Sequence, residues 1–258
     1  MNIAWADLQA LLNHYFWPWL RLLALFSAAP VFSEKQPGKK VKIALAVLIT
    51  LLVAPSLPAV AIPVFSAAGV WTGAKQLIIG VSIGLTIQMA FVAVRTAGEI
   101  IGLQMGLSFA TFFDPAGGQN MPVLSRLLNL FVTLLFLSFN GHLWLIAIVV
   151  QSFERLPIDD APLLRDGFYA LVEHAGIIFS YGLMLGLPVV TLLLAINLAL
   201  GLLNRLTPQL SIFVIGFPLT LTVGMLSLSM LMRTLTPFLE NLLRLLFDGL
   251  DEMLMMFI

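Results

Sequence analysis

The chain has 258 residues, of which 60% are hydrophobic and 10% are charged, whereas a soluble domain carries charge on roughly a quarter of its residues. Thirteen basic residues balance thirteen acidic ones, so net charge gives no sign of a nucleic-acid partner, and the lack of cysteine excludes disulfides and thiolate chemistry. At about 20 apolar residues per crossing, the length predicts an all-α, polytopic membrane protein with about six hydrophobic helices, in a single membrane domain over residues 1–258.

Hydrophobic segments and one basic loop make up the N-terminal part. The first segment spans residues 15–32 and contains Arg21. The polar stretch 33–42 that follows holds four lysines, and basic loops beside membrane segments stay on the cytoplasmic side. The second segment, residues 43–65, contains three prolines, and a third covers residues 71–94. Because an internal proline kinks or breaks a helix, we expect broken or kinked helices.

The region after the third segment is apolar, but it cannot form one helix. Arg95 and Glu99 stand four residues apart, so they can pair on one helix face if that helix is embedded. The stretch 106–122 then mixes aromatic and apolar side chains with helix breakers: Gly106, Phe109, Phe112, Phe113, Asp114, Pro115, Gly117, Gly118, Gln119 and Met121. Non-helical backbone at membrane depth must be buried in protein or line a cavity. The stretch is therefore either an ordinary interfacial loop or a plug in a pore.

Three more hydrophobic segments follow, over residues 127–150, 176–203 and 211–232, with a charged loop at 151–166. The C-terminal stretch 237–258 carries charges at steps of four and three, at Glu240, Arg244, Asp248, Asp251 and Glu252. This spacing places the charges on one stripe of a helix, so we predict an amphipathic C-terminal helix. Its apolar face fits either the bilayer interface or a partner subunit.

Glycines recur four positions apart in several segments: Gly80 and Gly84, Gly98 and Gly102, and Gly182 and Gly186. Residues four apart share a helix face, where glycine lets a second backbone approach closely. The pattern predicts tight helix packing, either inside the chain or between subunits.

The sequence offers no set of residues for catalysis or metal binding. Its three histidines lie in separate segments without metal-ligand spacing, and it has no phosphate-binding glycine loop. Acidic residues lie almost entirely in loops or at segment ends, which argues against a small-solute secondary transporter, the alternative function. We expect no enzyme activity, no cofactor and no nucleic-acid partner.

Four motifs stand out in order along the chain. They are Glu99-Ile-Ile-Gly-Leu-Gln-Met-Gly-Leu-Ser-Phe-Ala110 with Asp114-Pro115, then Gly141-His142, then Arg205-Leu-Thr-Pro-Gln-Leu210, and finally Ile215-Gly-Phe-Pro218. Together they resemble the FliR/SctT family of type III export-gate components, and the likeness spans nearly the whole chain. One departure is Ser211, where the family pattern has Asn.

The resemblance implies a subunit of the flagellar type III protein export gate, a helical assembly at the basal body in the bacterial inner membrane. One copy would join several FliP-like and FliQ-like subunits, with lipid and other export-apparatus proteins as further partners. Unfolded export substrates would pass through the pore, and residues 106–122 would form a plug loop sealed by its phenylalanines. The charged residues Arg95, Glu99, Arg126 and Arg205 would be buried and would anchor the loop and its surroundings.

Overall fold

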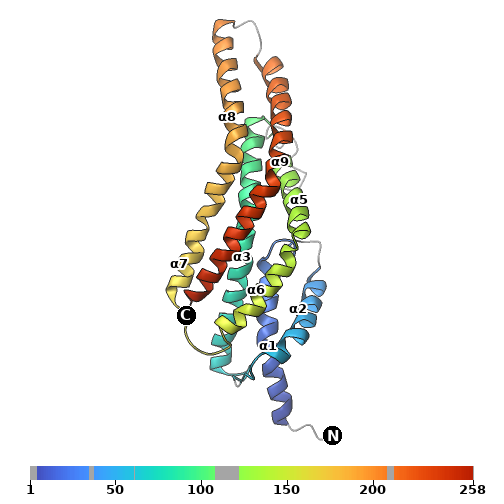
Figure 1. Cartoon of the computed structure of the whole chain (residues 1–258), viewed down its shortest axis with the longest axis vertical. Helices are drawn as coiled ribbons and strands as arrows, with labels where there is room; N and C mark the ends of the chain where they lie inside the picture. Colours follow the sequence, from blue (N-terminus) through green and yellow to red (C-terminus); the bar gives the residue numbers. More distant parts are fainter. Residues whose placement is uncertain (1–4, 35–37, 61, 108–121, 208–211, 258) are drawn as a thin grey trace. The chain divides into compact units, whose positions relative to one another are not determined.

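The computed structural model describes residues 5–34, 38–60, 62–107, 122–207 and 212–257. Every regular element in these residues is a helix, which confirms the all-α prediction. The elements, labelled in Figure 1, are α1 (Trp5–Ala28), α2 (Lys39–Val53), the short 3-10 helix η1 (Ala54–Ser56), α3 (Ala67–Gln104), α5 (Val123–Ser138), α6 (Gly141–Arg155), α7 (Arg165–His174), α8 (Gly176–Leu206) and α9 (Ile212–Met255).

Three described stretches are long and apolar enough to cross a membrane, namely residues 67–104, 165–206 and 215–255. The bent pair formed by α5 and α6 adds a fourth if it counts as one span. This is fewer than the six or so spans predicted from hydrophobicity. One reason is α2, which has 15 residues and so measures about 22 Å, short of the roughly 30 Å hydrocarbon core of a bilayer.

The last two predicted segments are one helix. α9 runs from Ile212 to Met255 through both Pro218 and Pro237. A proline removes one hydrogen bond of the helical ladder, and such prolines are tolerated in apolar helices whose neighbours satisfy the freed groups. The C-terminal helix predicted to begin at residue 237 is therefore the last part of a longer one.

The predicted segment 127–150 is broken in its middle. α5 ends at Ser138 and α6 begins at Gly141, and Asn140 between them has φ 56°. Asparagine adopts this left-handed conformation more readily than most residues. Asn-Gly is a turn signal. This break was not predicted from the sequence because the residues on both sides are apolar.

The chain divides into two compact units, each made of discontinuous stretches. Unit 1 holds residues 1–88, 136–175 and 245–258, and unit 2 holds residues 89–135 and 176–244. The unit boundaries fall inside α3, α5 and α9, so each of these helices contributes residues to both units. The single membrane domain expected from the sequence stays a prediction.

Unit 1 contains α1 and α2 side by side, with the first part of α3 packed on α1 (Figure 1). Gly80 and Gly84 of α3 form the contact with α1. A side chain at Gly84 would come within 2.8 Å of the backbone nitrogen of Ala29, and one at Gly80 would meet the carbonyl oxygen of Arg21. At these two positions the glycine spacing serves packing inside the chain.

The end of α9 also packs inside unit 1. Its apolar side chains Leu246, Leu250, Met253 and Leu254 are buried, as is Phe257 just after the helix. The Phe257 ring stands edge-on to Phe168 at 5.2 Å between ring centres, and Leu164 N–H donates to Phe257 O at 3.1 Å. The chain itself therefore covers the apolar face that the sequence assigned to a bilayer surface or a partner subunit.

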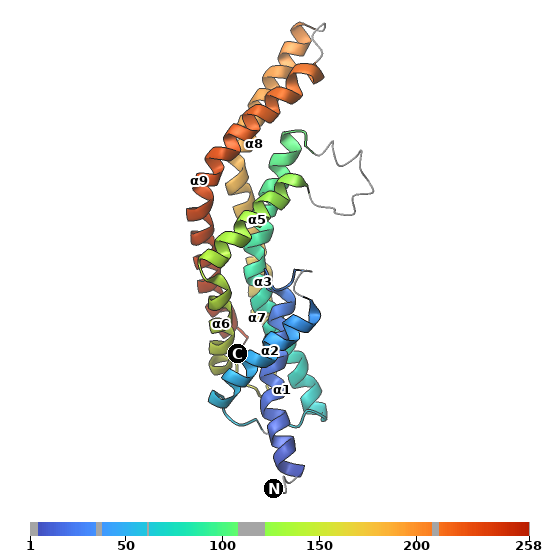
Figure 2. The ribbon, with the colours of Figure 1, turned by 90° about the vertical axis from the view of Figure 1, so that its right-hand side faces the viewer.

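In unit 2, α8 and the first part of α9 form a hairpin, and both views show them side by side (Figures 1 and 2). A side chain at Gly216 of α9 would lie 3.4 Å from Leu200 of α8. Large apolar side chains on both helices remain exposed, including Leu198, Met225 and Met230. Such surfaces are typical of helices that face lipid or other subunits.

Candidate functional site

The helix that leads into the predicted plug loop ends in a defined cap. The N–H of Gly106 donates to Leu103 O at 3.0 Å, and the N–H of Leu107 donates to Gly102 O at 3.0 Å. These are the two hydrogen bonds of a Schellman motif. Gly106 has φ 78°, a left-handed conformation that glycine adopts without steric cost. Gly106 therefore terminates α3 and fixes the point from which the following residues leave the helix.

The helix that follows the predicted loop packs on this same end of α3 (Figure 2). A side chain at Gly98 would lie 2.8 Å from Ser125 Cα, and Ser125 Oγ donates a 3.1 Å hydrogen bond to Arg95 O. One turn further along, a side chain at Gly102 would lie 3.8 Å from Leu124 Cβ. The last turns of α3 and the first turn of α5 are thus joined within unit 2.

α8 and α9 pack on other faces of the same stretch of α3. A side chain at Gly182 would come within 2.9 Å of Ala93 O, so α8 and α3 approach backbone to backbone. On α9, Gly224 leaves room for the side chain of Met105, whose Cε would lie 2.6 Å from an added Cβ. Met105 itself is fully buried. Three helices therefore hold the end of α3 in place inside unit 2.

The charges predicted to be buried have a different environment. Glu99, Arg126 and Arg205 are exposed and Arg95 is half-buried, so the expected burial is not found in the described chain. Arg95 and Glu99, both described, form no ion pair with each other. The isolated chain offers these helix surfaces to solvent, lipid or other subunits, so their anchoring role stays a prediction.

The loop residues themselves lie outside the described part of the chain. These are Phe109, Phe112, Phe113, Asp114, Pro115, Gly117, Gly118, Gln119 and Met121, all within residues 108–121. The described site consists of the two helix ends that flank them. Within the described residues, no three His, Asp or Glu side chains gather in a way that could hold a metal ion.

Unit 1 contains a buried polar cluster that reasoning from the sequence did not assign. Its centre is Arg21 of α1, whose side chain is completely buried. The guanidinium donates to Gln76 Oε1 at 2.7 Å, Ser152 Oγ at 2.9 Å and Leu156 O at 2.8 Å. It also stacks 4.1 Å from the centre of the Phe153 ring, a favourable cation–π geometry. One side chain thereby joins α1, α3 and the end of α6.

A second buried cation lies on α3. Lys75 is 3% exposed, forms an ion pair with Asp159, and donates to Ala161 O at 3.3 Å. These contacts hold the segment after α6 against α3. A lone cation inside an apolar run is a signal in its own right, and this signal could have identified both Arg21 and Lys75 from the sequence.

We expect Gly98→Ala to lower the stability of the chain. The new methyl group would meet the backbone of Ser125 at 2.8 Å, and overpacking of this kind costs about 1–3 kcal/mol. The matched control is Gly201→Ala on α8, where nothing lies within 4 Å, so the change gains up to about 1 kcal/mol of helix propensity. The measurement is the fraction of monodisperse protein left after heating in mild detergent. Equal stability of the two variants would contradict the close contact.

Comparison with known proteins gives a consistent result over nearly the whole chain. Residues 12–246 match the family described as bacterial export proteins, family 1. A flagellar biosynthetic protein FliR of Escherichia coli K12 is 57% identical over 243 residues, which cover 94% of this chain and 93% of the relative. The protein of the same name from Pectobacterium carotovorum is 56% identical over 248 residues, covering 96% and 95%. That of Bacillus subtilis 168 is 31% identical over 183 residues, covering 70% and 71%. The chain therefore belongs to family 1 of the bacterial export proteins.

Proposed function

We propose that the chain is a membrane subunit of the flagellar type III protein export gate, in the bacterial inner membrane at the basal body. It forms part of the pore through which unfolded substrates cross. The observation that carries this proposal is the packing of α3 and α5 around Gly98, which brings together the two helix ends on either side of residues 108–121. A segment held between two joined helices can close a pore without disturbing the helices that carry it.

Residues 106–122 act as the plug of this pore. The stretch carries Phe109, Phe112 and Phe113, and a hydrophobic constriction blocks water and ions by dewetting. Closure of this kind needs no catalytic residue, metal or cofactor. The close relatives named as flagellar biosynthetic proteins support the assignment to the flagellar system.

The other subunits of the gate are FliP-like and FliQ-like membrane proteins, several copies of each with one copy of this chain. The exposed face of α5 supports such an assembly, because it presents large apolar side chains at helical spacing: Leu127, Leu130, Phe131, Leu134 and Leu137. Its opposite face is buried through Leu124, Leu128, Val132 and Phe136. A short helix that is apolar on both faces is stable when lipid or another subunit covers the face that its own chain leaves exposed.

Co-expression with the FliP-like and FliQ-like proteins of the same bacterium tests this proposal. We expect purification in mild detergent and native mass measurement to give one discrete hetero-oligomer with a single copy of this chain. Leu134→Asn, on the exposed face of α5, is expected to reduce its yield. The control is Val172→Asn on α7, because Val172 is also exposed, at 71% against 56% for Leu134, but lies on another helix. A stable monomer without partners would overturn the export-gate proposal.

A further inference from the structure

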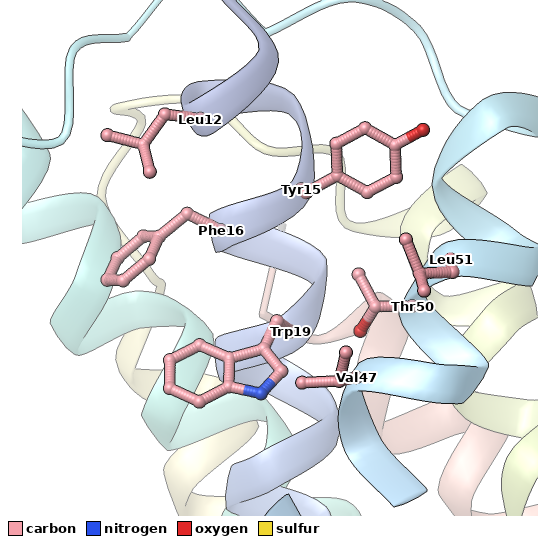
Figure 3. A pocket seen from close by; sticks show the side chains of 7 residues that line it. All are labelled: Leu12, Tyr15, Phe16, Trp19, Val47, Thr50 and Leu51. Atoms are coloured by element: carbon pink, nitrogen blue, oxygen red, sulfur yellow. The ribbon is translucent and has the colours of Figure 1, made fainter. Parts of the chain in front are cut away.

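Unit 1 carries an apolar groove between α1 and α2 that no part of the proposed export function uses. The groove has a volume of about 200 Å³, and Leu12, Tyr15, Phe16, Trp19, Val47, Thr50 and Leu51 line it. Figure 3 shows these side chains on the two antiparallel helices, with Tyr15 of α1 on the side toward α2 and Leu12 and Phe16 on the other side of α1. Pockets that enclose a compact, drug-sized ligand measure roughly 300–1,000 Å³. The smaller, open groove fits a single hydrocarbon chain that lies along it.

The groove has one unsatisfied polar group. The indole nitrogen of Trp19 is buried and has no hydrogen-bond partner, and Figure 3 shows it on the side of the ring that faces Val47. Thr50 Oγ, which donates to Ala46 O at 2.6 Å, does not accept from this nitrogen either. An indole N–H only donates, and a buried donor left unpaired is costly. The occupant of the groove should therefore bring a hydrogen-bond acceptor next to its apolar part.

Positive charge lies beyond the Trp19 end of the groove. α2 begins with Lys39, Lys40 and Lys42, of which the first two are exposed and the third is half-buried. At 1.5 Å per residue, these lysines stand about 7 to 12 Å along α2 from Val47, which equals or exceeds the thickness of one headgroup layer, about 5–7.5 Å. The first turn of α2 holds no acidic residue, so its helix dipole adds to the attraction for an anion.

We infer that this groove binds an anionic phospholipid. One acyl chain lies between α1 and α2, an ester carbonyl accepts the Trp19 N–H, and the phosphate is held by the lysines at the start of α2. From the groove toward the start of α2 the chain presents apolar side chains, then the Trp19 N–H donor, then lysines. This order matches the acyl chain, ester carbonyl and phosphate of such a lipid. Aromatic residues at the boundary of the hydrocarbon layer are typical of this arrangement. The inference goes beyond the export function and does not depend on it.

The test is native mass spectrometry of the purified full chain with added phosphatidylglycerol or phosphatidylcholine. We expect retained phosphatidylglycerol and little phosphatidylcholine. Changing Lys39, Lys40 and Lys42 together to Gln should weaken phosphatidylglycerol binding by about 100-fold, at about fivefold for each lysine near a lipid surface. The charge-matched control changes three exposed arginines, Arg165, Arg205 and Arg244, to Gln and should leave binding unchanged.

A second variant separates the groove from charge alone. Val47→Trp fills the groove while keeping every lysine, and it should abolish lipid retention. If the Val47→Trp variant loses its helical circular dichroism signal, the Leu51→Trp variant, which fills the other end of the groove, replaces it in the test. Equal retention of both lipids, or phosphatidylglycerol binding that survives a filled groove, would overturn the inference. The inference would also be overturned if the wild-type chain binds no lipid and a filled groove prevents co-purification of the FliP-like and FliQ-like subunits. That result would make the groove a binding site for another subunit.

Discussion

A bacterial membrane that contains the assembled gate is expected to become permeable to ions when residues 109–119 are replaced by a glycine-serine linker of equal length. The linker keeps the span between α3 and α5 but removes every phenylalanine of the loop. Without an apolar constriction, water fills the pore and ions follow it. The flanking contacts at Gly98 and Ser125 lie outside the replaced residues, so assembly should persist.

The measurement is passive ion flux into vesicles that carry the assembly, combined with native mass of the purified complex. The control is Asp114→Asn, which changes a polar loop residue and keeps all three phenylalanines, and which should stay sealed. A sealed membrane with the linker would show that another element closes the pore. Loss of the complex would show that the loop is needed for assembly, which contradicts the plug proposal.

Arg21→Ala is expected to destabilise the chain by about 2–6 kcal/mol, the cost of leaving two buried acceptors unpaired. The change leaves the acceptors Gln76 Oε1 and Leu156 O without their donor, and each buried polar group left unpaired costs about 1–3 kcal/mol. It also removes a completely buried side chain that stacks on Phe153. The loss should appear as a lower unfolding temperature in mild detergent.

Two further variants identify what Arg21 contributes. Arg21→Lys keeps the charge, but a single ammonium cannot reproduce the planar fork that reaches three acceptors, so it should recover only part of the stability. Arg244→Ala is the control, because Arg244 is 74% exposed and pairs with Glu240 at 2.7 Å, an arrangement worth less than about 1 kcal/mol. If Arg21→Ala and Arg244→Ala unfold at the same temperature, the buried cluster contributes nothing to stability.

Continuous apolar runs could be read well from the sequence. The segment predicted at residues 176–203 is α8, Gly176–Leu206, which continues through Pro188, because a long apolar run has few alternatives to a helix. Interruptions were harder to read. Pro237 does not end α9, whereas Asn140 does end the helix before it, since the outcome at each position depends on the contacts of the flanking turns.

The sequence predicted that helices pack closely at the site, but not which residues touch. Glycine spacing indicated close packing, but it could not say that Gly98 meets Ser125 and Gly182 meets Ala93, because partners are set by the tertiary fold. The hydrogen-bond partners of Arg21 lie 55, 131 and 135 residues away in sequence. No periodic pattern reports on separations of that size, so an isolated cation in an apolar run was the only available clue.

The cap that ends α3 makes the neighbouring segment exchangeable in evolution. Its two hydrogen bonds close the helix at Leu107, and α5 restarts with a bond from Arg126 N–H to Pro122 O at 3.1 Å. An insertion or deletion confined to residues 108–121 leaves the register of both helices unchanged, since the cost of closing a loop grows only slowly with its length. Relatives can therefore differ in the length and sequence of this segment without any change to the helices on either side of it.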